Sequence, residues 1–247
     1  MGTVSFRHHI RWGSDAASEP TSTLVLTSPG HYFVDIRVFK TALRHYQSSE
    51  ASTKSSGPPS LAREQLDWAI GGTSTSTQRT RPDGTRVSHS VFTHWVDSRT
   101  RDPESATDEG DMLPQPDGTT LEIGRMVNPA TGIETDYEEL WRDGASENVP
   151  ALAKWTVLQI QDESQQKRGM FVQLGQYAQA VLRVGDIFTA ERWEWDSSQS
   201  TWVGTFRVGD DEAFPLDDLI PTCQEVHHAG EEIEAWSGIW SVLEASG

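Results

Sequence analysis

Apolar and polar residues alternate along much of this chain, and a period of two residues predicts half-buried β-strands rather than helices. In the first such segment, one face carries the alternate residues Val4, Phe6, His8, Ile10 and Trp12. A hairpin is predicted over residues 21–39, turning at the Ser-Pro-Gly step of residues 28–30. One face of its second strand carries Tyr32, Val34, Ile36 and Val38.

The longest alternating segment covers residues 66–98 and is predicted to form two strands joined by an Arg-Pro-Asp-Gly turn at residues 81–84. In the second strand, strict alternation sends His94 to one face and both Trp95 and Asp97 to the other. A large indole beside a carboxylate suits neither a solvent-facing surface nor a plain apolar core. This face is therefore predicted to be the wall of a lined cavity.

The remaining segments extend the pattern. Residues 47–60 are predicted to form a mobile, serine-rich loop and residues 99–118 a solvated acidic loop, before a strand at 119–127 and a short element at 135–142. After a small, polar linker at 145–150, five candidate strands and a helical turn at 215–223 complete the chain. In the last strand, Trp236 and Trp240 are predicted to share a face. This spacing predicts a meander barrel or sandwich in each half.

Composition narrows the choice of partners. The formal net charge of −17 repels phosphate backbones, so no nucleic acid partner is expected. No run approaches the roughly 20 apolar residues that span a bilayer, and no membrane partner is expected. We predict a cytoplasmic, or also nuclear, protein. The single cysteine excludes an intrachain disulfide and a thiolate metal cluster.

The ten tryptophans among 247 residues stand out. Barrels use single indoles as core filler, whereas together they also suit an aromatic-lined pocket; both roles stay open. Adjacent histidines at 8–9 and 227–228 face opposite ways on a strand, so neither pair chelates an ion through both rings. We expect no metal and no cofactor.

Polar and aromatic residues on two of the predicted elements are candidates for a chemical or a structural role. Asp97 either meets an arginine or tyrosine structurally, or acts on a ligand as hydrogen-bond acceptor or acid/base. His94 is expected to point outward or between the two halves. Near the end of the first half, a structural clasp between the halves is predicted for Glu139, Trp141 and Arg142.

Several short motifs together resemble the fungal Hri-type protein family, whose yeast founder is named as an interactor of a casein-kinase-1 homologue. The motifs are Gly30-His31-Tyr32 with Arg37 and Phe39, Trp68-Ala69 with Gly72-Thr73, Phe92 with Trp95 and Asp97, Glu139-Leu140-Trp141, and Gly169 through Gly175. The resemblance covers nearly the whole chain. It implies an all-β fold of two tandem calycin-like (lipocalin-like) antiparallel barrels, here an N-terminal barrel at 1–148 and a C-terminal barrel at 149–247.

The same architecture resembles a group of fungal secondary-metabolite enzymes, cofactor-free hetero-Diels-Alderases that join a tropolone-derived o-quinone methide to a humulene-type terpene. The indole count and His94, where the founder's pattern is expected to have an apolar residue, favour this branch. A cycloaddition needs two reactants held in near-attack geometry, a dry pocket and a hydrogen-bond donor that polarises the heterodiene.

The first hypothesis is therefore a pericyclase that binds an aromatic or terpenoid small molecule. Its catalytic candidates are Asp97, Arg142 and Tyr32. Its substrate-binding candidates are Trp68, Thr73, His94, Trp95 and Trp141. The alternatives are a non-catalytic adaptor that contacts a kinase of the casein-kinase-1 type, and a carrier of a small apolar ligand. The sequence leaves a homodimer open.

Overall fold

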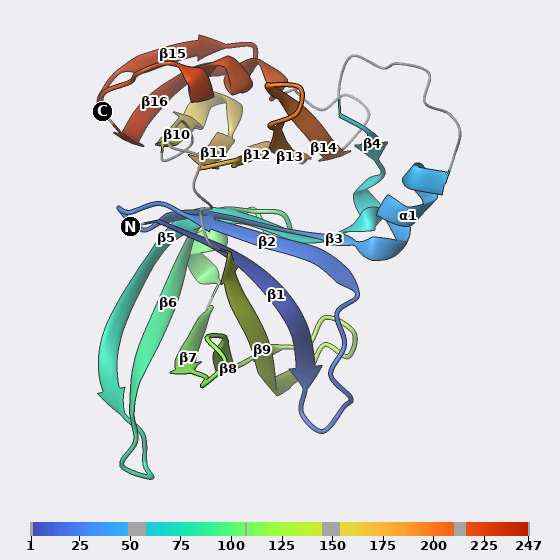
Figure 1. Ribbon diagram of the computed structural model, residues 1–247, viewed down its shortest axis with the longest axis vertical. Coiled ribbons are helices and arrows are strands. Elements are labelled where there is room, and N and C mark those ends of the chain that lie inside the picture. The colour runs from blue at the N-terminus through green and yellow to red at the C-terminus, as the bar shows by residue number, and fades with distance from the viewer. Residues whose placement is uncertain (1, 49–57, 107, 145–153, 210–215, 247) are drawn as a thin grey trace.

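A computed structural model of the chain describes residues 2–48, 58–106, 108–144, 154–209 and 216–246. Eight strands close into an antiparallel barrel (Figure 1). In spatial order they are β1 (Thr3–Trp12), β2 (Thr21–Thr27), β3 (Tyr32–Phe39), β5 (Leu66–Thr80), β6 (Arg86–Asp97), β7 (Glu109–Pro114), β8 (Thr120–Val127) and β9 (Glu134–Gly144). The predicted N-terminal barrel is confirmed.

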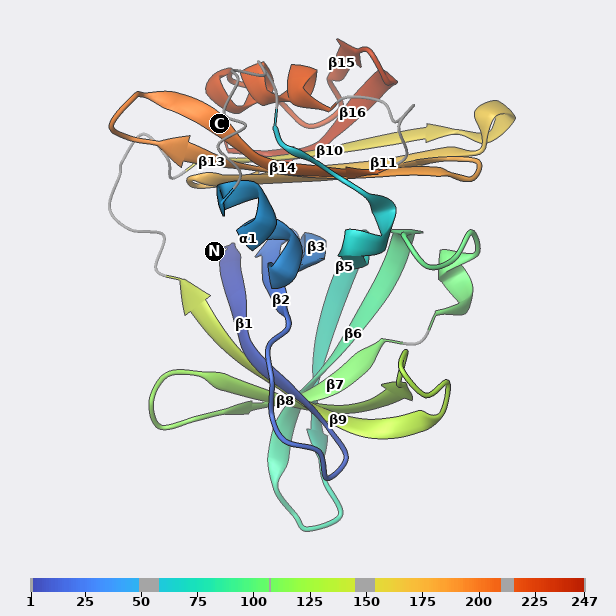
Figure 2. The ribbon, with the colours of Figure 1, turned by 90° about the vertical axis from the view of Figure 1, so that its right-hand side faces the viewer.

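The second half forms a large, mainly antiparallel sheet that lies across the barrel (Figure 2). Its order is β15 (Glu232–Ala235), β16 (Gly238–Ala245), β10 (Trp155–Asp162), β11 (Lys167–Leu174), β12 (Tyr177–Val184), β13 (Ile187–Asp196), β14 (Thr201–Gly209) and β4 (Ser60–Leu61). The all-β fold class is confirmed, and this sheet is consistent with the second barrel. Its edge strand β4 comes from the first half of the chain and pairs with β14 in parallel.

Helices are few and short. The α-helix α1 (Lys40–Ser48) follows β3 and lies between the barrel and the sheet in Figure 2. The 3₁₀ segments are η1 (Arg63–Gln65), η2 (Pro103–Ser105), η4 (Glu163–Gln165) and η5 (Asp217–Gln224). The last of these confirms the helical turn predicted from the sequence.

An apolar layer joins the barrel wall to the sheet. The barrel contributes the buried residues Leu24, Leu26, Val34, Ile36, Val38, Ala69 and Val96. The sheet contributes Val157, Met170, Val172, Val181, Phe188, Ala190, Phe206 and Val208. The predicted common face of β3 is confirmed, since Tyr32 packs against the same cluster as its alternate neighbours. Burying this face explains why β2, β3 and β5 form the wall nearest the sheet.

Two glycines allow close packing at this wall. A Cβ at Gly71 would lie 2.9 Å from the Cβ of Met170, so a larger residue would push the sheet away from β5. A Cβ at Gly72 would lie 2.0 Å from the carbonyl oxygen of Thr93 on β6. There β6 carries a β-bulge, because Gly71 pairs with Val96 and Gly72 with His94, which leaves Trp95 without a partner on β5.

Several boundaries predicted from the sequence need correction. The acidic segment at 99–118 is not a solvated loop: it contains η2 and the barrel strand β7, and it buries Asp108 and Asp111. Two of the five strands predicted in the second half are hairpins, β11–β12 and β15–β16, so that half contains seven described strands. The residues around the linker at 145–150 and most of the predicted loop at 47–60 lie outside the described residues. The domain boundary at 148/149 stays a prediction.

Candidate site inside the N-terminal barrel

The interior of the barrel is polar and charged, unlike the apolar layer outside it. Arg7 forms buried ion pairs with Glu19 and Glu139, and the same Glu139 carboxylate accepts a hydrogen bond of 3.1 Å from Arg37. Arg37 also binds Asp35, with 2.8 Å between Nε and Oδ2. Buried charges persist only when they are paired, and Arg37 links the carboxylate of Asp35 on β3 to that of Glu139 on β9.

A cavity of about 250 Å³ lies in the barrel beside this network, and we call it the barrel cavity. Its polar and charged lining includes His31, Asp35, Arg37, Ser90, Asp108 and Glu122. Its apolar lining includes Val25, Phe33, Ile70, Phe92, Met112 and Trp141. Phe33 and Phe92 meet edge to face with their centroids 5.7 Å apart. Aromatic walls with a few polar groups are typical of a small-molecule site, and the volume suits a small ligand.

Glu122 of β8 is a wholly buried acid at the wall of this cavity. Its two carboxyl oxygens lie 2.8 Å from the Tyr137 hydroxyl and 2.9 Å from Nε1 of Trp141, which donates to it. Burial, together with the charges of Glu139 and Asp108, raises the pKa of Glu122 to about 8. The carboxyl group is therefore mostly protonated at neutral pH. Burial and the neighbouring carboxylates also raise the pKa of Tyr137.

A second buried cluster centres on His94. Its Nδ1 lies 2.9 Å from Oδ2 of Asp97 and its Nε2 3.2 Å from Oδ2 of Asp108. Burial alone would lower the pKa of His94, but the hydrogen bonds to the two carboxylates raise it to about 9. The ring is thus an imidazolium that donates from both nitrogens at neutral pH. This cluster joins the end of β6 to the residue before β7.

The predicted orientation of His94 is wrong, and the bulge at Trp95 is the reason. The extra residue in β6 shifts the alternation, so His94 and Asp97 turn toward the same side. Asp97 also accepts a 2.9 Å hydrogen bond from Nε1 of Trp68. Burial would raise the pKa of Asp97, but the bonds from His94, the Arg99 backbone and Trp68 outweigh it and lower the pKa. Asp97 is therefore a fully partnered carboxylate.

Trp68 lies at the opposite end of the barrel from the barrel cavity. The guanidinium groups of Arg37 and Arg99 stack on its ring, with their Cζ atoms 5.1 and 4.2 Å from the ring centroid, respectively. A hollow of about 440 Å³ opens there, lined among others by Trp12, Phe39, Trp68 and Arg99. Arg37 lines both this hollow and the barrel cavity, so its guanidinium group and ion pairs divide the interior in two.

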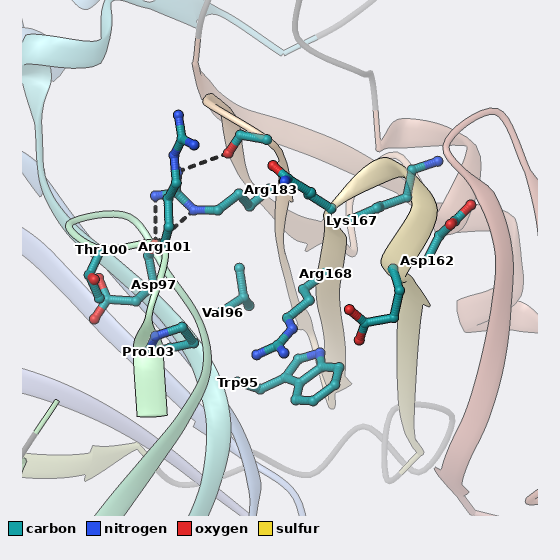
Figure 3. Close-up of a pocket in the computed structure, with 13 residues that line it drawn as sticks. Trp95, Val96, Asp97, Thr100, Arg101, Pro103, Asp162, Lys167, Arg168 and Arg183 are labelled. Atoms are coloured by element: carbon teal, nitrogen blue, oxygen red, sulfur yellow. Dashed lines mark hydrogen bonds between the residues drawn. The ribbon is translucent and has the colours of Figure 1, made fainter. Parts of the chain in front are cut away.

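Trp95 faces the junction between barrel and sheet instead. The guanidinium group of Arg168 on β11 lies over its ring at 4.6 Å, and Figure 3 shows the two side chains together. A junction pocket of about 260 Å³ is lined there by residues of both halves, including Arg101, Lys167 and Arg183. Arg183 donates to the backbone oxygen of Asp97 (Figure 3) and to that of Ser98, and so ties β12 to the end of β6.

The structure brings only some of the predicted site residues to one cavity. Trp141 lines the barrel cavity. Tyr32 packs on the apolar layer outside the barrel. Its partner on β5 is Thr73, which lies between the cavity residues Ile70 and Ser74 in sequence but does not itself line the cavity. Arg142 is exposed, and its Nε donates to a ring nitrogen of His8 at 3.3 Å.

The predicted clasp between the halves is wrong for its two buried members. Glu139 binds Arg7 and Arg37, and Trp141 binds Glu122, all within the barrel. β9 pairs with β1 and β8 to close the barrel, so alternate side chains of β9 point into the interior. The contacts between the halves include the apolar layer, hydrogen bonds from Arg183 and Arg192, and the carboxylate of Glu244, which accepts from Ser28 and Gly30.

On its face away from the barrel, the second half encloses an apolar core. That face buries Leu158, Phe171, Leu182, Trp193, Leu216, Leu219 and Trp240. Trp240 is fully buried there, with its Nε1 donating to Ser237, whereas Trp236 at the turn of the β15–β16 hairpin is 84% exposed. The predicted common face of these two indoles is wrong because the hairpin turn separates them.

Sequence reasoning missed the acids that line the barrel cavity, above all Asp35 and Glu122. Each occupies the inward position of an alternating strand, where apolar residues are expected. The signal was present: Asp35 interrupts the apolar segment of β3, and an isolated acid in a buried strand is costly unless it has a partner or a role.

The comparisons with known proteins add a family and a fold. The family model described as Protein HRI1 matches residues 3–244. A crystal structure of an uncharacterized protein from Saccharomyces cerevisiae matches with a TM-score of 0.73 at 17% identity, covering 100% of both chains. At that identity the likeness shows the fold alone. The search of curated proteins gave no match.

The described residues contain no group of three or more histidine, cysteine or acidic side chains placed to hold a metal ion. Within the same described part of the chain, no helix has the length and apolar character needed to cross a bilayer.

Proposed function

The chain belongs to the Protein HRI1 family, and we propose that it binds a small organic molecule in the barrel cavity. One observation carries this proposal: the barrel keeps a cavity of about 250 Å³ with aromatic walls and buried polar groups, while the corresponding interior of the second half is occupied by its own side chains. A barrel that served only as a scaffold would gain stability by filling such a space.

Trp141 provides the readout, because a ligand that enters the cavity contacts its indole. Titration with tropolone, a flat oxygenated ring, is expected to quench tryptophan fluorescence saturably. Thr120→Phe places a ring in the cavity and should abolish the saturable quenching. Thr75→Phe, on an exposed position of β5, is the matched control and should bind like the wild type. Equal binding by both variants would contradict the proposal, as would the absence of saturable quenching by tropolone together with no binding of the amine and alcohol probes described below.

The pericyclase predicted from the sequence is a second candidate, and Glu122 is the observation that favours it. A buried carboxyl group whose pKa is raised to about 8 is neutral at pH 7, and a neutral acid donates a hydrogen bond to a carbonyl oxygen. Glu122 would polarise an o-quinone methide, while Trp141 and Phe92 would hold its ring. The volume of about 250 Å³ fits one ring-sized reactant, so the hydrocarbon would approach from the mouth.

Incubation of the protein with an o-quinone methide generated in situ and humulene tests this chemistry. An enzyme gives an adduct enriched in one stereoisomer, and Glu122→Gln lowers the rate about 10²-fold if the acid polarises the heterodiene. A racemic adduct formed at the background rate would end the pericyclase proposal without affecting ligand binding.

An adaptor that contacts a kinase of the casein-kinase-1 type is the remaining candidate. It is favoured by large apolar side chains on the β15–β16 hairpin, where Trp236 is 84% and Ile239 58% exposed. Exposed indoles are common anchors at protein interfaces. In a pull-down with such a kinase, Trp236→Ser should reduce capture at least about tenfold, as expected for a hot-spot residue, and Thr120→Phe should leave capture unchanged.

A further inference from the structure

A carboxylate oxygen in the barrel cavity has no hydrogen-bond partner among the described residues. Asp35 is only 3% exposed and lines the cavity. Its Oδ2 accepts from Arg37, but its Oδ1 is buried without a donor. A buried acceptor without a partner costs free energy, more so when it belongs to a charged group. Asp35 therefore presents a ready acceptor to whatever occupies the cavity.

The lining of the cavity is rich in acids. Asp108 and Glu122 are buried in its wall, and Asp143 lies at its exposed rim, where it accepts from Ser5. Against these acids and Asp35, the lining contains one guanidinium group, that of Arg37, and the imidazole of His31. Arg37 is already shared between Asp35 and Glu139, and His94 between Asp108 and Asp97, so the acidic groups around the cavity outnumber their cationic partners.

The protonation of Glu122 reports the same excess. The charges of Glu139 and Asp108 add to burial in raising its pKa to about 8. The acid stays neutral because a further negative charge inside the barrel would be unstable. A bound cation would reverse this effect, since it lowers the cost of a carboxylate beside it.

The apolar part of the lining suits the body of such a ligand. Phe33, Phe92 and Trp141 present aromatic surface around the acidic groups. Aromatic faces attract cations and pack against flat or hydrocarbon groups. The cavity thus combines acceptors for a positive head with an apolar wall for its substituent.

We propose that the ligand of the barrel cavity is a small organic ammonium ion, whose N–H groups donate to Oδ1 of Asp35 and whose aromatic or hydrocarbon group packs on Trp141 and the two phenylalanines. This inference rests on the proposed ligand-binding function and names the class of ligand. It is independent of the cycloaddition, whose reactants carry no charge.

Isothermal titration at pH 7 with three probes of one skeleton tests the charge and the donor separately. The probes are phenethylamine, which is cationic at this pH, 2-phenylethanol, its neutral counterpart, and the N,N,N-trimethyl derivative of phenethylamine, which keeps the charge but has no N–H. Charge-assisted hydrogen bonds favour the amine over the alcohol by about tenfold or more. The trimethyl derivative should bind more weakly than the amine.

Two variants locate the effect in the cavity. Asp35→Asn should reduce amine affinity about tenfold or more, bringing it to the level of the alcohol. Asp136→Asn, an exposed Asp on β9 paired with Arg125, is the matched control and should change nothing. Should Asp35→Asn fail to fold, the three probes on the wild-type protein, with Thr120→Phe as the variant whose cavity is blocked, supply the comparison.

The outcomes separate this inference from the function it rests on. Equal affinity for amine and alcohol, with both blocked by Thr120→Phe, would overturn the cationic ligand and keep the binding site. Equal affinity for the amine and its trimethyl derivative would overturn the hydrogen bond to Asp35. Tropolone binding that is lost in Thr120→Phe, with no binding of any phenethyl probe, would also overturn the cationic ligand. No binding of tropolone or of any phenethyl probe would overturn both proposals.

Discussion

The apolar layer and the barrel interior are both buried, yet they are built from opposite kinds of side chain. The layer consists mainly of apolar side chains from β2, β3, β5 and β6 against β10 to β14. The interior of the same barrel holds Arg7, Arg37, His94 and their carboxylate partners. β3 contributes to both, because successive side chains point to opposite faces.

This contrast separates stability from binding. Removing apolar surface from water stabilises a fold at about 25 cal/mol per Å², so the layer between barrel and sheet is where folding free energy is gained. Paired buried charges contribute little net stability compared with apolar residues of the same size. A barrel interior that keeps such charges and a cavity is therefore better explained by binding than by stability.

Phe206→Ala should have the largest effect on stability. Phe206 is fully buried in the apolar layer on β14, far along the chain from the barrel cavity. Losing a phenyl group there costs about 3–5 kcal/mol, measured by urea unfolding. Val203→Ala, at a 44% exposed position of the same strand, is the control and should cost far less. Equal losses would mean that the layer does not hold the two halves together.

His94 should make stability depend on pH inside the barrel. Its pKa rises from 6.5 to about 9 on folding, so the stabilisation is full below pH 6.5 and is lost as pH rises through 9. The loss is roughly 3 kcal/mol. Unfolding at pH 6 and pH 9.5 should show at least this difference in the wild type, because Glu122 ionises in the same range, and a smaller one in His94→Gln. Exposed His228→Gln should behave like the wild type; a wild-type slope in His94→Gln would contradict the imidazolium assignment.

Glu139→Gln should have a smaller effect, because the amide keeps an acceptor but loses the charge shared by Arg7 and Arg37. We expect a loss of about 2 kcal/mol in the free energy of unfolding. Glu138→Gln, the neighbouring position on the outer face paired with Arg11, is the control and should change stability within about 0.5 kcal/mol. If both variants unfold alike, the buried pairs do not organise the interior.

Trp236→Ser should change stability least. The indole is 84% exposed at the tip of the β15–β16 hairpin, so its removal is expected to shift the free energy of unfolding by no more than about 0.5 kcal/mol. Trp240→Ala, at the fully buried indole on the same hairpin, should cost about 3–5 kcal/mol. Similar effects of the two changes would instead support the prediction that both indoles share one face.

Alternation predicted most strands correctly but failed where polar residues have buried partners. The acids of β7 look like a surface run, and this pattern predicts a solvated loop. In the structure, Asp111 pairs with Arg79 of β5 and His89 of β6. Those partners are distant in sequence, and no local pattern reports them. The directions of His94 and Asp97 were mispredicted for a related reason. A one-residue bulge such as that at Trp95 is defined only by the register of the partner strand.

The candidate site was predicted in kind rather than in detail. An indole-lined cavity in a barrel was expected, and Trp141 does line one. Trp68, Trp95 and His94 lie in three other environments: the opposite end of the barrel, the junction pocket and a buried ion cluster. Aromatic composition signals that pockets exist, but the residues that share one come from strands far apart in the chain.

The sequence by itself determined that this chain is all β, because a period of two residues permits little else, and it placed β1, β3, β5, β6, β8 and β9 close to their observed positions. Only the tertiary structure decided which interior is filled and which stays open. Filling depends on how side chains from different strands meet, and inward-facing positions hold Phe171 in the second half but Asp35 in the barrel.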